Sequence, residues 1–367
     1  MFLSGYIVDI RHNMPLIWNK KRGGKIIGQG TYGCVFNPPL KCDPKFQGNS
    51  NNSNSDNNGK RKKPSSKYIG KAMLDDDEYE AEKAIMAKVK AIDPNGDFTL
   101  GVEHSCQVTS VSSSDLSAPS RNCSKDSIME KGQLIYKNGG VTLLDYIGTS
   151  PTRFFQVIKG FGNIIRGVQK IHDHGLFHGD IKPENILFSK EEKKMYLIDF
   201  GMSVSMNKVY EVVPGSFYTY MYASYIYFPP EFFWFHQMTN KRRVSVDSMI
   251  HNFEKSWVFG DIRDFNALCH MDIDSGITQF HAIMASMNNV LSQKLKPVFA
   301  DKADVYELGM TLFVLIKRCY EYIKTQKHTL QLTLLKHIVA NMANPNVFAR
   351  WDMNQTISAW EEFENLL

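Results

Sequence analysis

Cysteine is scarce in this sequence, and its spacing is wide. The chain has 367 residues but only six cysteines, and no two of them form a C-x-x-C pair. Disulfide frameworks are typical of short chains with dense cysteines, and zinc ribbons require closely paired cysteines. The spacing therefore favours a reduced, intracellular chain with neither a disulfide framework nor a zinc ribbon.

Long apolar runs are also missing. No stretch approaches the roughly 18 uninterrupted apolar residues that a membrane helix requires. The apolar start of the chain is too short for a signal peptide, and Asp9 and Arg11 interrupt it. These absences predict a soluble protein of the cytoplasm or nucleus that has no membrane partner.

The excess of positive charge is small. Lys and Arg total 43 and Asp and Glu total 38, which leaves a net charge of +5. Segment 37–67 holds seven basic and two acidic residues and accounts for the whole excess. A balance this even does not mark a dedicated nucleic-acid binder, so no nucleic-acid partner is expected. The apolar share of 43% is enough for a buried core, and the length suits two domains or one bilobal unit.

The first third of the chain mixes strand patterns with segments that lack any pattern. Residues 1–24 are predicted to be an N-terminal extension ahead of a strand, turn and strand at 25–36. Segment 37–67 is rich in Asn, Ser and Lys and cannot bury enough apolar surface to offset its ordering entropy, which predicts a disordered insert. A strand at 67–73 follows, and the serine-rich residues 109–127 predict a surface loop.

Helical patterns dominate the rest of the chain. Apolar residues recur at three- and four-residue steps across 151–173, which predicts a long amphipathic helix. The same spacing within 236–300 indicates a folded helical insert, and the residues after Asp304 are mainly helical. His172 and His174 have no third ligand nearby in the sequence, so a surface or helix-capping role is favoured over metal binding.

A glycine pattern near the N-terminus suggests a phosphate-binding turn. Gly28, Gly30 and Gly33 are followed by Val35 in the form G-x-G-x-x-G-x-V. Glycines let the backbone approach phosphate oxygens closely, but the pattern alone also occurs in ordinary turns. A dinucleotide-binding site would require a helix directly after the glycines. Residues 34–36 continue as a strand instead, which favours a hairpin that covers a nucleotide.

The segment His178-Gly-Asp-Ile-Lys-Pro-Glu-Asn185 contains the most specific chemistry. Phosphoryl transfer needs metal ions on the phosphates, a carboxylate at the attacking hydroxyl and a cation on the transferred group. Asp180 can accept the proton of the hydroxyl or orient it, and Lys182 can neutralise the phosphoryl charge. Asn185 and, further along the chain, Asp199 offer the hard oxygen ligands that suit Mg²⁺.

With these motifs in this order, the sequence resembles the eukaryotic-type protein kinase family over roughly 25–36, 67–231 and 300–365. The resemblance implies an α+β, bilobal fold. A small antiparallel N-lobe with one main helix would span 25–139, and a larger, mainly helical C-lobe would span 140–367. It also implies ATP and Mg²⁺ as cofactors and a protein substrate with a serine or threonine acceptor.

The resemblance also assigns roles to further residues. It implies that Lys71 holds the α- and β-phosphates and that Glu82 is its partner, with Glu78 and Glu80 as alternatives. It places Glu231 and Arg350 in an ion pair. The segment expected to contact adenine through its backbone comprises Tyr136, Lys137, Asn138 and Gly139. Ser224 stands where serine/threonine kinases place a hydroxyl that bonds the catalytic aspartate and lysine, so it joins Asp180 and Lys182 as a catalytic candidate.

Two departures from the family pattern affect the prediction. Gly179 replaces the arginine that usually grips a phosphate on the activation loop, so we expect activity without phosphorylation of that loop. The insert at 236–300 emerges near the expected peptide surface, where it either docks substrates or merely elaborates the fold.

Two other functions stay open at this stage. A small-molecule phosphotransferase is suggested by the His-Gly-Asp order at 178–180, while Lys182 and the Pro-Pro-Glu231 motif favour a protein kinase. A pseudokinase-like binding scaffold would usually have lost Lys71, Asp180 or Asp199, and none is lost. The asparagine-rich insert and the His-Gly-Asp loop also resemble kinases of large DNA viruses, which would place the protein in a host cell or a virion. The sequence does not indicate the oligomeric state.

Overall fold

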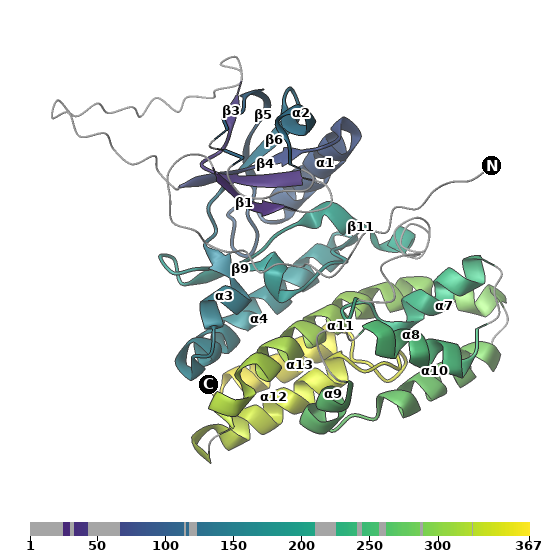
Figure 1. Ribbon diagram of the computed structural model, residues 1–367. Coiled ribbons are helices and arrows are strands. Elements are labelled where there is room, and N and C mark those ends of the chain that lie inside the picture. Colours follow the sequence, from purple (N-terminus) through teal and green to yellow (C-terminus); the bar gives the residue numbers. More distant parts are fainter. Residues whose placement is uncertain are drawn as a thin grey trace. The chain divides into compact units, whose positions relative to one another are not determined.

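The computed structural model describes most of the chain, and the fold is α+β as expected (Figure 1). The described residues are 25–29, 33–42, 67–113, 115–116, 123–209, 225–240, 244–256, 262–286, 289–324 and 326–367. The predicted extension 1–24 and residues 43–66 of the predicted insert lie outside them. The chain divides into two compact units, one within residues 1–84 and 102–138 and the other within 85–101 and 139–367.

An antiparallel sheet of six strands forms the first unit, in the order β1-β2-β4-β6-β5-β3. The strands are β1 (Lys25–Gln29), β2 (Gly33–Asn37), β3 (Lys41–Cys42), β4 (Tyr68–Met73), β5 (Val102–Ser110) and β6 (Gly132–Lys137). Alternate residues of a strand point to opposite faces of a sheet. Cys34, Phe36 and Ala72 are therefore buried in one apolar core, whereas Lys71 points to the other face.

Helix α1 (Asp76–Ile92) begins in the first unit, and the short helix α2 (Lys125–Ile128) lies within it. Helix α1 has acidic residues throughout its first turn, where they interact favourably with the helix dipole. Helix α2 starts at Ser124, whose hydroxyl accepts a hydrogen bond from the Ser127 N–H. It buries Ile128 in the same core as Phe36.

Two disulfides cross-link the first unit, so the expectation of a chain without structural disulfides is wrong. Cys34 pairs with Cys123, and Cys42 pairs with Cys106. The partners are 89 and 64 residues apart in sequence, but their Cα atoms lie only 6.0 and 5.7 Å apart. For Cys42 and Cys106 the sheet brings the partners together, because β3 pairs with β5. Cysteine spacing therefore gives no argument for a reducing compartment, and an intracellular location stays a prediction.

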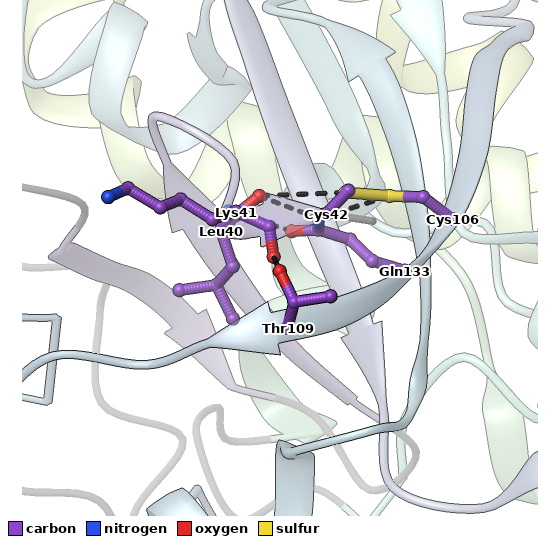
Figure 2. Close-up of a disulfide and its surroundings, with 6 residues drawn as sticks. All are labelled: Leu40, Lys41, Cys42, Cys106, Thr109 and Gln133. Atoms are coloured by element: carbon purple, nitrogen blue, oxygen red, sulfur yellow. Dashed lines mark hydrogen bonds between the residues drawn. A yellow bond between two sulfur atoms is a disulfide. The ribbon is translucent and has the colours of Figure 1, made fainter. Parts of the chain in front are cut away.

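The Cys42–Cys106 disulfide lies beside a buried glutamine (Figure 2). The Gln133 amide accepts a hydrogen bond from Leu40 N–H at 2.9 Å and donates one to Leu40 O at 3.1 Å. Its Nε2 also lies 3.2 Å from Cys42 Sγ. Gln133 thus ties the segment before β3 to β6, and its buried amide is fully used.

Helices form most of the second unit. Helix α4 (Pro151–Asp173) has the predicted bounds, with Ser150 as its N-cap and proline in its first turn. It packs against α11 (Asn289–Ile323) and α13 (Met353–Glu364), and α12 (Thr329–Met342) lies beside α11 (Figure 1). In the described residues, four further helices lie between α4 and α11 in the chain. They are α7 (Pro230–Thr239), α8 (Val246–Ser256), α9 (Ile262–Cys269) and α10 (Ile273–Ser286).

Short strands and turns in the second unit carry the polar loops. Strands β7 (Val141–Thr142), β9 (Ile186–Ser189) and β10 (Lys194–Leu197) form one small sheet, and β8 (Leu176–Phe177) pairs with β11 (Val204–Ser205). Helix α3 (Leu143–Ile147) follows β7. The 3-10 turns are η2 (Pro183–Asn185), η3 (Phe200–Met202), η4 (Met206–Lys208) and η5 (Gln326–His328). Within the described parts of the chain, no helix is long and apolar enough to cross a membrane.

The expected ion pair between Glu231 and Arg350 is confirmed. The Arg350 guanidinium donates to both carboxylate oxygens of Glu231, at 2.6 and 3.0 Å, and both side chains are fully buried. Arg350 also donates to the backbone oxygens of Asn344 and Lys302. The pair therefore joins the start of α7 to α11 and to the segment before α13.

Reduction should destabilise the first unit. Each disulfide closes a long loop, so reduction should lower the free energy of unfolding by about 2–4 kcal/mol per cross-link. Denaturant unfolding with and without a phosphine reductant measures this difference. The Cys269→Ala variant, which lacks one of the two free cysteines, should show the same difference in unfolding free energy as the wild type. Identical unfolding midpoints under both conditions would contradict the cross-links.

Breaking the buried ion pair should be costly. Glu231→Ala or Arg350→Ala leaves an uncompensated buried charge and should lower the free energy of unfolding by about 3–5 kcal/mol in denaturant titrations. Arg166→Ala is the matched control. It breaks a pair with Glu364 at 3.0 Å whose side chains are 45% and 26% exposed, and should cost less than about 1 kcal/mol. If all three variants lost the same free energy of unfolding, burial would not be the reason why the Glu231–Arg350 pair is costly to break.

Candidate active site

In the first unit, a buried carboxylate holds a lysine. Lys71 Nζ lies 2.9 and 2.7 Å from the two carboxylate oxygens of Glu82, whose side chain is 5% exposed. The alternative Glu80 pairs with Lys83 instead. The Tyr136 hydroxyl donates to Glu82 Oε1 at 3.1 Å, which sequence reasoning missed because it assigned only the backbone of Tyr136. The two contacts with Glu82 therefore fix the position of the Lys71 ammonium group.

The glycine hairpin is built as predicted in its described part. Gly28 of β1 lies opposite Val35 of β2, and Gly30 lies outside the described residues. A Cβ at Gly33 would lie 2.8 Å from the Ala72 carbonyl, so close approach of β4 requires glycine there.

Residues 136–139 lead out of the first unit. Tyr136 and Lys137 end β6, and Asn138 N–H donates to Lys67 O at 2.8 Å. Gly139 is the first residue of the second unit along this stretch. A Cβ on Gly139 would come within 2.6 Å of the Leu100 side chain and 2.9 Å of the Leu187 side chain, so a larger residue there would require these leucines to shift.

In the second unit, the polar residues predicted after β8 meet at Asp180. Asp180 Oδ2 accepts hydrogen bonds from Lys182 Nζ at 2.9 Å and from Asn185 Nδ2 at 2.7 Å. Burial works against a charge on Lys182, but Asp180 raises the pKa of this lysine above its ordinary value. The other oxygen, Oδ1, accepts a hydrogen bond from the hydroxyl of Tyr225. Ser224, the residue that the sequence favoured for a hydroxyl at this place, lies outside the described residues.

The two predicted metal ligands lie on adjoining segments. Asn185 O accepts the N–H of Ile198, the residue directly before Asp199. Asp199 has a left-handed backbone with φ 63° and ψ 72°, which is uncommon for a non-glycine residue and recurs at functional sites. The Asn185 amide donates to Asp180, so its oxygen is the atom left for a cation. Mg²⁺ often takes one or two protein oxygens beside phosphates, so these two residues fit it.

Helix α11 supports the backbone of this loop through Asp304. Its carboxylate oxygens accept the N–H groups of His178 and Gly179, both at 2.9 Å. Gly179 has a positive φ of 81°, and a Cβ there would lie 2.8 Å from the Phe177 ring. Glycine therefore suits this backbone where the family pattern has arginine. The Phe200 ring packs against His178.

His172 is buried beside the same carboxylate, which corrects the expectation of a surface or capping role. Its Nδ1 lies 3.0 Å from Asp301 and its Nε2 lies 2.8 Å from Asp304. Burial alone would lower the pKa of His172, but the hydrogen bonds to the two aspartates raise it to about 9. His174 is exposed and contacts Lys170 O at the end of α4, as a capping residue would.

The raised pKa of His172 predicts that stability depends on pH. A histidine with a pKa of about 9 when folded and about 6.5 when unfolded contributes stability that is complete below pH 6.5. That contribution, roughly 3 kcal/mol, is lost as the pH rises through 9. Denaturant titrations between pH 6 and 10 should show the loss in the wild type and in His174→Gln. His172→Gln should lack this component, and an unchanged pH profile in that variant would contradict the assignment.

Known proteins resemble parts of this chain. Residues 136–249 match the protein kinase domain. The chain is 34% identical over 93 residues to "Probable serine/threonine-protein kinase fnkB" of Dictyostelium discoideum, which covers 25% of this chain and 17% of the relative. It is 41% identical over 70 residues to calcium-dependent protein kinase 20 of Oryza sativa subsp. japonica, with 18% and 12% covered.

A third relative is mitogen-activated protein kinase kinase kinase 8 of Rattus norvegicus, which is 35% identical over 80 residues, with 22% of this chain and 16% of the relative covered. The chain thus spans less than a fifth of the length of these curated relatives. The relatives named here are eukaryotic, and the resemblance to viral kinases stays a prediction. The domain match and the grouping of Lys182 and Asn185 on Asp180 together show that residues 136–249 are similar to the protein kinase domain of these serine/threonine and other protein kinases.

Proposed function

We propose that this chain is an ATP-dependent protein serine/threonine kinase. The proposal rests on the contacts of Asp180, whose two carboxylate oxygens have different hydrogen-bond partners. One carboxylate oxygen is held by Lys182 and Asn185, and the other accepts a hydrogen bond from a hydroxyl, that of Tyr225. A carboxylate fixed in this way can orient an alcohol and receive its proton.

The residues of the second unit supply the polar groups that transfer requires. Asp180 Oδ1 would orient the serine or threonine hydroxyl, and Lys182 would stabilise negative charge on the transferred phosphoryl group. Asn185 and Asp199 would hold Mg²⁺, which supplies charge neutralisation on the phosphates when bound.

The residues of the first unit would bind the nucleotide. Lys71, held by Glu82, would contact the α- and β-phosphates of ATP, and the hairpin with Gly28, Gly30, Gly33 and Val35 would cover them. The backbone of Tyr136, Lys137, Asn138 and Gly139 would contact adenine. The aspartate, lysine and asparagine of residues 180–185 are all present in their family order, which favours an active enzyme over a scaffold.

A serine or threonine acceptor is the finer part of the proposal. Lys182 stands two residues after Asp180, which is the form typical of serine/threonine kinases, and the relatives named above include serine/threonine kinases. We also propose that activity does not require phosphorylation of the activation loop, because Gly179 offers no cation to receive that phosphate.

Loss of Lys71 should abolish most activity. Lys71→Ala removes the cation that positions the phosphates and should lower kcat/KM by about a hundredfold or more. The assay is transfer of radiolabelled phosphate from ATP to mixed protein substrates, with small alcohols as competing acceptors. Lys83→Ala is the matched control, because Lys83 is an exposed lysine of α1 that pairs with Glu80 and lies over the Tyr79 ring, so it should be replaceable.

Three outcomes of that assay would contradict the proposal. A loss below threefold in Lys71→Ala would contradict the role of this lysine. Labelling of the alcohols without labelling of proteins would indicate a small-molecule phosphotransferase. Nucleotide binding without any transfer in the wild type would indicate a binding scaffold.

A further inference from the structure

Ile181 is the residue between Asp180 and Lys182, and side chains of α11 hold both of its backbone polar groups. Its N–H donates to Glu307 Oε2 at 2.6 Å, and its carbonyl accepts a hydrogen bond from Thr311 Oγ1 at 3.1 Å. Glu307 and Thr311 are fully buried and lie one helical turn apart, so they project from the same face of α11. The Ile181 side chain is also fully buried.

The same face of α11 also carries Asp304, one turn before Glu307. Asp304 already binds the N–H groups of His178 and Gly179. Three side chains of one buried helix therefore fix four backbone groups in the loop of residues 178–181. The hydrogen bonds of Glu307 and Thr311 are separate from those of Asp304, because they act on the two peptide groups that join Ile181 to the catalytic candidates Asp180 and Lys182.

A buried glutamate is a costly residue for a helix core. Burial, Asp304 and Asp180 raise the pKa of Glu307 well above its ordinary value, which favours the neutral acid. Its Oε1 has no hydrogen-bond partner among the residues that the structure describes. A group that served only packing would be better replaced by an apolar side chain of similar size. The hydrogen bond from Ile181 N–H to Glu307 explains why a carboxyl group is present at this buried position.

The position of Ile181 explains how this bond could matter for transfer. Residues 180 and 182 flank Ile181, and their side chains meet where Lys182 Nζ lies 2.9 Å from Asp180 Oδ2. The burial of the Ile181 side chain and the two hydrogen bonds to its backbone fix the chain on both sides of Ile181. They therefore set the directions in which the side chains of its two neighbours point. A displacement of about 1 Å in a reacting group can cost roughly a hundredfold in rate.

We propose that Glu307 and Thr311 are positioning residues that hold Asp180 and Lys182 in place through the backbone N–H and C=O of Ile181, an inference that rests on the proposed kinase function. Both residues are fully buried, so they act through the backbone and not by contact with a substrate. Their effect is on the placement of Asp180, so it should be seen in the turnover step and leave nucleotide affinity unchanged.

Replacement of Glu307 tests the inference. Glu307→Leu removes the acceptor for Ile181 N–H and should lower kcat about tenfold or more, with KM for ATP changed less than about twofold. Glu307→Gln keeps an amide oxygen at the same place and should restore kcat to within about threefold of the wild type. Radiolabelled phosphate transfer measures kcat and KM, and thermal unfolding shows that each variant is folded.

Tyr306→Phe is the matched control on the same helix. Tyr306 is fully buried next to Glu307, and its hydroxyl has no hydrogen-bond partner within the described part of the chain. Its ring lies 4.8 Å from the Arg350 guanidinium, a contact that phenylalanine keeps. This variant changes a buried polar atom of α11 without touching Ile181, so kcat and KM should stay within about twofold of the wild type.

Thr311 provides a second test if Glu307→Leu does not fold. Thr311→Val keeps the side-chain shape but removes the donor to Ile181 O, and it should lower kcat about threefold to tenfold. Thr311→Ser keeps the hydroxyl and should restore most of that loss.

The possible outcomes separate this inference from the proposed function. Full kcat in Glu307→Leu or in Thr311→Val would overturn the inference while the kinase function stands. Equal losses in Glu307→Leu and Glu307→Gln would also overturn it, because the Gln variant keeps the bond to Ile181. Absence of transfer by the folded wild type, in contrast, would remove the proposed function itself.

Discussion

Asp304 is a fully buried carboxylate that accepts hydrogen bonds from His178 N–H, Gly179 N–H and the ring of His172. A buried charge is tolerated only when such bonds satisfy it, so the residues around Asp304 have little freedom to move. The loop that follows β8 takes its path from these bonds. The grouping of Lys182 and Asn185 on Asp180 depends on that path, and so does the chemistry that we propose for the second unit.

The first unit reaches a comparable rigidity by other means. Its sheet places Lys71 on the face opposite the apolar core, where the nearly buried Glu82 neutralises it. Two disulfides and the buried amide of Gln133 then connect strands that are distant in sequence. A small sheet buries limited apolar surface, and cross-links compensate for this by restricting the unfolded chain. The hairpin with Gly33 is cross-linked directly, through Cys34 of β2.

The parts of the fold that sequence reasoning predicted well are those with local causes. Helix α4 has the predicted bounds, because its apolar period, its N-cap and its first-turn proline all lie within the segment itself. The choice of Glu82 over Glu80 also followed from a position on α1. His172 was misjudged because its neighbours in sequence suggest a helix end, whereas its two aspartate partners come from α11, more than a hundred residues later.

By itself, the sequence determined the residue types of the candidate site and their order, because Asp180, Lys182 and Asn185 lie in one short loop where spacing controls contact. It also determined the Glu231–Arg350 pair once the family resemblance was recognised. Only the tertiary structure decided which cysteines pair, that Tyr225 reaches Asp180, and that Glu307 binds Ile181. The residues in the last two contacts are 45 and 126 positions apart in the chain. Contacts between such distant residues depend on strand register and helix packing, which a single sequence does not specify.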